Sequence, residues 1–189
     1  MTIVAIWCRH KGDNIIGAGS GLPWNIPSDT RRFRNLTEGK IKVMGRRTYE
    51  GMPQKVLMGK RLIVLDIDNS CEVFDKENHF VVDDADKLKD YPEDLYISGG
   101  ASVYFKFFST PAIMPDIVVD CVYQGEIAPE LTDLINVGKS VEVLEEKYFA
   151  LPQRFELDNV ITAVWLKKGD FVEQSAVKNI LQYLETEGK

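Results

Sequence analysis

The sequence has little of the chemistry that builds metal centres or disulfide frameworks. Its 189 residues include two histidines and three cysteines, and Cys8, Cys71 and Cys121 lie far apart with no Cys-x-x-Cys pair. This spacing argues against a disulfide scaffold and favours reduced thiols in the core of a cytoplasmic protein. So few histidines also argue against a histidine-rich metal centre, so we expect no bound metal.

Long apolar runs are missing as well. No stretch approaches the roughly 20 residues that a membrane-spanning helix needs, and the first residues lack the basic leader of a secretory signal. We therefore expect a cytoplasmic protein that binds no membrane. The length predicts a single domain over residues 1–189, with an appended amphipathic helix over residues 171–187.

Positive charge is scarce outside the first third of the chain. Residues 1–61 carry 12 Lys and Arg against 4 Asp and Glu, residues 62–189 carry 11 against 25, and the net charge is −6. A basic first third in an acidic chain predicts an anionic ligand held by that third. A nucleic-acid partner is not expected, because no Lys/Arg run is interleaved with aromatic residues.

The G-x-G-x-x-G fingerprint of dinucleotide-binding proteins is also absent, but a different glycine loop organises the chain. Residues 16–29 hold three glycines within five positions, two prolines around Trp24-Asn25, and then Ser28-Asp29. Glycine lets a loop move and lets a ligand approach the backbone. Ser28 or Asp29 stands where a helix N-cap is expected, so Asp29 is either a cap or a carboxylate that points into a pocket.

Two short strands run directly through glycine into helices. The first junction is Gly45-Arg46-Arg47 after residues 41–44, and the second is Gly99-Gly100 after residues 95–98. A helix N-terminus binds phosphate through unpaired N–H groups and a partial positive charge. Two such junctions suit the extended anionic body of a dinucleotide, whereas a solvated basic turn is the alternative for the arginines.

Hydrophobic patterning predicts an α/β fold with a mainly parallel sheet. We expect buried strands over 2–8, 41–44, 61–66, 95–98 and 117–123, and short strands over 71–74 and 79–82. Helices are expected over 30–36 and 83–90, and over 171–187 at the C-terminus. Residues 124–139 are expected to be irregular, and residues 141–144 and 154–166 to form antiparallel edge strands.

In this order and spacing, the motifs resemble those of dihydrofolate reductase. They are Leu22-Pro23-Trp24-Asn25-x-Pro27-x-Asp29-x-x-x-Phe33, Val43-Met44-Gly45-Arg46-x-Thr48-Tyr49-Glu50, Gly59-Lys60, and Ser98-Gly99-Gly100-x-x-Val103-Tyr104. The resemblance covers about residues 3–123, and the long segment before Leu22 is similar to that of some phage-encoded members. It implies a mixed, mainly parallel sheet with helices on both faces, antiparallel C-terminal strands and an extra C-terminal helix.

The resemblance also implies an activity: the NADPH-dependent reduction of 7,8-dihydrofolate to tetrahydrofolate. Hydride passes to C6 of the pterin while N5 gains a proton, and Asp29 would hydrogen-bond the pterin edge and favour that protonation. A carboxylate in an apolar, half-closed pocket has a raised pKa and can handle a proton near neutrality. Trp24 and Leu22 would belong to the mobile loop that closes over both ligands.

The remaining site residues follow from the same resemblance. The substrate or an antifolate would be bound by Ala5, Thr30, Phe33, Arg34, Met52, Leu57, Lys60, Arg61, Ser98, Tyr104 and Asp120. The cofactor would be bound by Ile16, Gly17, Gly45, Arg46, Arg47, Thr48, Asp66, Gly99, Gly100, Ala101, Ser102 and Val103, with a cis peptide between Gly99 and Gly100. Phe33, Met52 and Leu57, taken singly, are more often core residues than part of a ligand wall, and Trp24 is also explained as core.

Four positions depart from the family pattern. Lys60 stands where an Arg usually clamps the glutamate tail of folate, so either Lys60 or the adjacent Arg61 serves. Asp66 stands near the site that reads the 2′-phosphate, which favours a ribose hydroxyl and leaves NADH as an alternative cofactor. Ser98 replaces an apolar residue. Asp120 replaces a hydroxyl residue and would neighbour Asp29, unless a one-residue register slip turns it away.

Two other functions remain open on the sequence. One is the reduction of a ribosylated aminopyrimidine of riboflavin synthesis on the same fold, and the other is a non-catalytic binding or structural protein. We expect a monomer, with a homodimer through the C-terminal helix as the alternative.

Overall fold

A computed structural model describes residues 1–19 and 21–187; Ser20, in the predicted glycine loop, and residues 188–189 lie outside the described residues. Within this part of the chain the centre is a nine-stranded sheet in the order β10-β11-β7-β1-β6-β3-β4-β5, with β9 paired to β11. Its strands are β1 (Ile3–His10), β3 (Ile41–Gly45), β4 (Leu62–Leu65), β5 (His79–Val82), β6 (Leu95–Ile97), β7 (Ile117–Tyr123), β9 (Tyr148–Ala150), β10 (Phe155–Leu157) and β11 (Val160–Lys167).

The sheet is parallel from β7 across β1 to β5, and antiparallel from β7 onward to β11 and β10. A second, two-stranded sheet pairs β2 (Ile15–Ala18) with β8 (Leu134–Asn136). The helices are α1 (Pro27–Leu36), α2 (Arg46–Gly51), α3 (Gln54–Leu57), α4 (Ala101–Ser109), α5 (Gly138–Lys147) and α6 (Gln174–Glu187), with 3-10 turns at η1 (Ala85–Leu88) and η2 (Pro111–Ile113). The predicted α/β sheet, its antiparallel C-terminal strands and the C-terminal helix are therefore confirmed.

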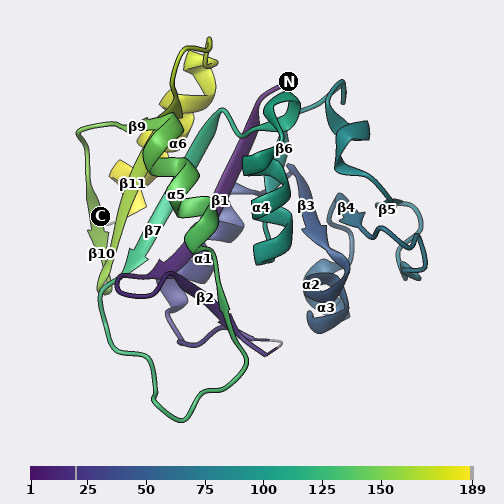
Figure 1. Ribbon diagram of the computed structural model, residues 1–189, viewed down its shortest axis with the longest axis horizontal. Helices are drawn as coiled ribbons and strands as arrows, with labels where there is room; N and C mark the ends of the chain where they lie inside the picture. Colours follow the sequence, from purple (N-terminus) through teal and green to yellow (C-terminus); the bar gives the residue numbers. More distant parts are fainter. Residues whose placement is uncertain (20, 188–189) are drawn as a thin grey trace.

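Helices cover both faces of the sheet (Figure 1). Successive side chains of β1 point to opposite faces and are apolar on both, so both faces need a covering layer. Ala5 and Trp7 face the layer that contains α4 and α5. Val4 and Ile6 face the layer that contains α1 and α6. The apolar residues of α6 are buried on this second layer, so the helix packs on its own sheet.

The carboxyl ends of the parallel strands meet at one end of the molecule, beside α2 and the β2–β8 sheet (Figure 1). In open α/β sheets, ligands bind outside the carboxyl ends of the strands. Among the described residues, no helix is both long and apolar enough to cross a membrane.

Three local predictions were wrong. Residues 141–144 belong to helix α5, because Val141 and Leu144 are spaced for one buried helix face. Residues 71–74 are not assigned to a strand, and Cys71 instead packs in a small core cluster beside Tyr49. The segment 124–139 is not wholly irregular, because β8 forms by pairing with β2.

Candidate active site

Asp29 lies within the first turn of α1 and is not its cap. The helix begins at Pro27, with Ile26 as the N-cap residue. Proline suits this first position because its fixed φ is already helical and its missing N–H would have no partner there. Asp29 therefore stands two positions inside the helix, and its carboxylate is free to turn towards the sheet.

The surroundings of Asp29 favour its protonated form. Burial raises the pKa of the Asp29 carboxyl group above its usual range, although Arg32 and the thiol of Cys8 oppose the rise. Cys121 also lies near Asp29, because burial and the charge of Asp29 together raise the pKa of the Cys121 thiol to about 12. The pKa of Asp29 is thus shifted in the direction that lets a carboxyl group hold a proton to higher pH than it does in water.

The predicted pair of Asp29 and Asp120 does not form. In the β1–β7 register, Trp7 is opposite Asp120 and Cys8 is opposite Cys121. Asp120 therefore shares the face of Trp7, whose Nε1–H donates to its Oδ1 at 2.6 Å, and Arg9 forms an ion pair with the same oxygen at 2.8 Å. A shift of one residue along a strand reverses the face, so Cys121 occupies the position that we predicted for Asp120.

The two glycine junctions lie side by side, as a shared dinucleotide site requires. The Gly45 N–H donates to the Gly99 carbonyl at 2.8 Å, and the peptide between Gly99 and Gly100 is cis. A Cβ on Gly45 would come within 3.0 Å of Val103, and one on Gly100 within 3.2 Å of the Thr48 hydroxyl. The starts of α2 and α4 can therefore come this close because Gly45 and Gly100 have no Cβ.

Arg46 and Asp66 also come together at this edge. Arg46 Nη1 lies 3.7 Å from Asp66 Oδ2 and 2.5 Å from the Ser70 hydroxyl. Asp66 is almost fully buried, and its Oδ2 accepts the N–H groups of Ser70 and Cys71, both at 2.8 Å. The carboxylate of Asp66 therefore holds the turn after β4, while Arg47 on α2 is exposed.

The loop residues differ in how firmly they pack. Leu22 is 57% exposed, whereas Trp24 packs against Tyr123 with ring centroids 5.0 Å apart and the rings tilted by 48°. Within the described residues, the buried Trp24 Nε1 has no hydrogen-bond partner. Ile16 packs against the core layer of α4, and Gly17 is paired to Ile135 in the small sheet.

The predicted substrate wall is divided among three core clusters. Ala5 faces α4, on the opposite face of β1 from Cys8, the β1 residue that hydrogen-bonds Asp29. Phe33 packs in the layer of α1, while Met52 and Leu57 belong to the cluster around Tyr49. Thr30 and Arg34 are exposed on α1.

Lys60 and Arg61 have different partners. Lys60 Nζ lies 3.2 Å from Glu38, just beyond the end of α1, whereas Arg61 makes a two-pronged contact with Glu93 before β6. Ser98 donates its hydroxyl to the carbonyl of Tyr96. The Tyr104 hydroxyl donates to the carbonyl of Ile6 at 2.5 Å and so ties α4 to β1.

The sequence reasoning missed Cys8, Cys121 and Arg32 as neighbours of Asp29. Arg32 is 1% exposed, although a run of arginines on a helix is typical of a solvated face. Its position three residues after Asp29 on one helix was the available signal, because such residues share a face. Among the described residues, no group of metal-ligating side chains gathers.

A parallel sheet whose strands pass through glycine into adjoining helix starts, with a carboxylate of raised pKa nearby, is the architecture of a nucleotide-dependent α/β enzyme. The family model for dihydrofolate reductase matches residues 2–131. The dihydrofolate reductase of Enterococcus faecium is 33% identical over 162 residues, which cover 81% of this chain and 93% of that protein. The enzyme of Neisseria gonorrhoeae is 38% identical over 126 residues, which cover 67% and 76%.

The fold agrees with this match. The structure of dihydrofolate reductase from Enterococcus faecalis in complex with NADP(H) and RAB-propyl superposes with a TM-score of 0.68 at 19% identity, over 88% of this chain and 96% of that one. The chain belongs to the dihydrofolate reductase family. Similarity to phage-encoded members stays a prediction.

Proposed function

We propose that this chain reduces 7,8-dihydrofolate to 5,6,7,8-tetrahydrofolate with NADPH, and that Asp29 is the carboxylate that supports protonation of N5. The observation that carries the role of Asp29 is its place inside α1, turned towards Cys8 and Arg32, with a raised pKa. A helix cap would instead bind the backbone of its own first turn. Membership of the dihydrofolate reductase family supports the substrate and the reaction.

The residues at the two glycine junctions fit a dinucleotide. The spaces at Gly45 and Gly100 are ones that a Cβ would fill, and Gly100 is the N-cap residue of α4. We assign the phosphates to these helix starts and to Arg46, Arg47 and Thr48. Arg47, exposed at the start of α2, supports NADPH over NADH, because Asp66 is already bound by Ser70 and Cys71.

When bound, the reduced nicotinamide supplies the hydride. Asp29 hydrogen-bonds the pterin edge and, because its pKa is raised, holds a proton to higher pH than a free carboxyl group does. Leu22, which is largely exposed, and Trp24, which is anchored on Tyr123, form the loop that excludes water from the reacting groups. Phe33, Met52 and Leu57 supply the apolar wall.

Lys60 is our choice for the contact to the glutamate tail. It lies beside the end of α1, while the fork of Arg61 is bound on both prongs by Glu93. A lysine is a point charge, so this contact is weaker and less directional than the arginine clamp of the family.

The packing of α6 and the composition of the main sheet support a monomer with one domain. The apolar residues Val177, Ile180 and Leu184 of α6 are buried against the sheet of their own chain, and strands from both halves of the chain share that sheet. The reduced state of Cys8, Cys71 and Cys121 supports a cytoplasmic location.

The test is NADPH oxidation with dihydrofolate from pH 5 to 9, for the wild type, Asp29→Asn and the matched surface variant Asp90→Asn, whose side chain is 86% exposed. We expect turnover in the wild type and in Asp90→Asn, and its collapse in Asp29→Asn. Full activity of Asp29→Asn would refute the role of Asp29. A wild type that binds NADPH without turnover would point to an aminopyrimidine substrate or to a binding function.

A further inference from the structure

A buried ion pair joins the C-terminal helix to the helix that carries Asp29. Arg32 Nε on α1 lies 2.6 Å from Glu187 Oε2 on α6, and their side chains are 1% and 4% exposed. Burying two charges is costly unless each is well paired. A buried pair that includes a residue near the end of the chain therefore suggests a role other than keeping the surface soluble.

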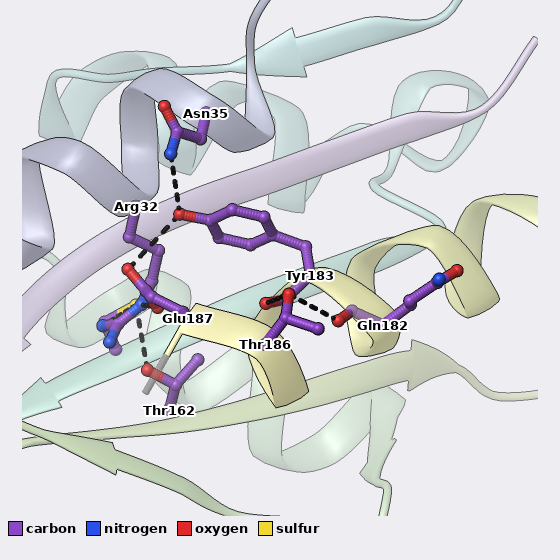
Figure 2. Close-up of polar contacts among 8 residues, drawn as sticks. Arg32, Asn35, Thr162, Gln182, Tyr183, Thr186 and Glu187 are labelled. Atoms are coloured by element: carbon purple, nitrogen blue, oxygen red, sulfur yellow. Dashed lines mark hydrogen bonds and ion pairs between the residues drawn. The ribbon is translucent and has the colours of Figure 1, made fainter. Parts of the chain in front are cut away.

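The pair is held from both sides by polar contacts (Figure 2). Tyr183 on α6 donates its hydroxyl to the second carboxylate oxygen of Glu187 at 3.4 Å, and Asn35 on α1 donates to the same hydroxyl at 3.2 Å. On the sheet side, Arg32 Nη1 points to the sulfur of Cys121 at 3.7 Å. Arg32 is thus fixed between α6 and β7.

Arg32 is also three residues from Asp29 on the same face of α1. Glu187 and Cys121 hold the guanidinium between α6 and the sheet, and its charge acts on the Asp29 carboxyl group. We propose that Glu187 is a positioning residue of the active site: through Arg32, the C-terminal helix determines the electrostatic surroundings of Asp29. This inference rests on the proposed role of Asp29 and adds α6 to the catalytic apparatus.

The charges act on Asp29 in opposite directions. Besides burial, Arg32 lowers the pKa of Asp29 and Glu187 raises it. The other titratable groups that face Asp29 are Cys8 on β1 and Cys121 on β7, with Tyr104 on α4 behind them. Burial raises the pKa of the thiols and the phenol, so they stay neutral at pH 7, and the pair of Arg32 and Glu187 supplies the charges.

A cavity borders the buried pair. A cavity of about 320 Å³ lies between α1, β10 and α6, and both Arg32 and Glu187 line it. Glu185, two residues before Glu187, lines the same cavity but is exposed. This makes Glu185 the matched control, because it has the same chemistry on the same helix without the contact to Arg32.

The experiment follows the carboxyl ¹³C resonance of Asp29, identified by its loss in Asp29→Asn, through a pH titration of the protein without substrate or cofactor. The variants are Glu187→Gln, Arg32→Met, Arg32→Lys and Glu185→Gln. We expect the titration midpoint to move to lower pH in Glu187→Gln and to higher pH in Arg32→Met. Arg32→Lys keeps the positive charge and should restore the midpoint towards that of the wild type, while Glu185→Gln should leave it unchanged.

The midpoint of the pH profile of kcat/KM should move in the same directions. A merely structural pair would lower the melting temperature of both variants without opposite displacements of the two midpoints. If Glu187→Gln titrates like Glu185→Gln, or if both members of the pair move the midpoint in one direction, the proposal is wrong. Should Arg32→Met fail to fold, Glu187→Gln against Glu185→Gln decides the question alone. The titration needs no turnover, so its outcome is independent of the substrate assignment.

Discussion

The carboxylate of Asp120 is a structural group, and its removal should cost stability and leave the chemistry of Asp29 intact. Asp120 accepts hydrogen bonds from Trp7 Nε1 at 2.6 Å, from Arg9 Nε at 2.8 Å and from Arg9 Nη2 at 2.9 Å. The side chains of Arg9 and Asp120 are 13% and 3% exposed. Asp120→Ala would leave the guanidinium of Arg9 and the indole N–H of Trp7 without these acceptors.

The magnitude follows from burial. Removing one partner of a buried ion pair costs about 3–5 kcal/mol. Arg9 keeps some exposure and has a second acceptor, Asn14 Oδ1 at 2.7 Å. We therefore expect Asp120→Ala to lower the free energy of unfolding by about 3 kcal/mol. For a chain of this length, that loss lowers the melting temperature by about 6–12 °C.

Urea and thermal unfolding of Asp120→Ala and Asp120→Asn would measure the loss, which should be smaller for Asn because it keeps an acceptor oxygen. The control is Asp83→Ala, because Asp83 forms an ion pair with Lys87 at 2.6 Å but both side chains are largely exposed. Its loss should stay below about 1 kcal/mol.

A loss below about 1 kcal/mol in Asp120→Ala would refute the reasoning from burial. The pH profile of turnover gives a second test. Because the neighbour of Asp29 on β7 is Cys121, replacing Asp120 should leave the midpoint of that profile in place. A displaced midpoint would mean that Asp120 acts on Asp29 after all.

Two further predictions concern the substrate tail and the stability of the site. Lys60→Ala should raise KM for dihydrofolate with little change in kcat. Arg61→Ala should change neither KM nor kcat, because it removes only an exposed ion pair. Equal effects of the two variants in steady-state kinetics would contradict our choice of Lys60. The pKa of Asp29 is raised on folding, so the folded state binds the proton more tightly than the unfolded state does. Stability therefore falls as pH rises from the unfolded pKa of Asp29 through its folded pKa. Asp29→Asn should therefore melt at a higher temperature than the wild type at pH 7, and the difference should vanish below about pH 4; a less stable variant at pH 7 would show that the charged form is favoured.

The errors along the chain have a common physical origin. Residues 141–144 alternate like a strand, yet their burial is decided by α4, against which α5 packs. Ser28 and Asp29 are both good capping residues, but Pro27 suits the first helical position and starts the helix earlier. Local preference left both choices open, and packing partners distant in the sequence settled them.

What the sequence by itself determined was the family, the parallel strands of the main sheet, the C-terminal helix and the two glycine junctions, because motif spacing, hydrophobic period and turn chemistry are local properties. Only the tertiary structure decided which residues surround Asp29. A shift of one residue in β7 exchanges Asp120 for Cys121, since successive side chains of a strand point to opposite faces. The pairing of Arg32 with Glu187 brings together residues 155 positions apart. Such a contact depends on how α6 docks on the sheet, and no local pattern encodes it.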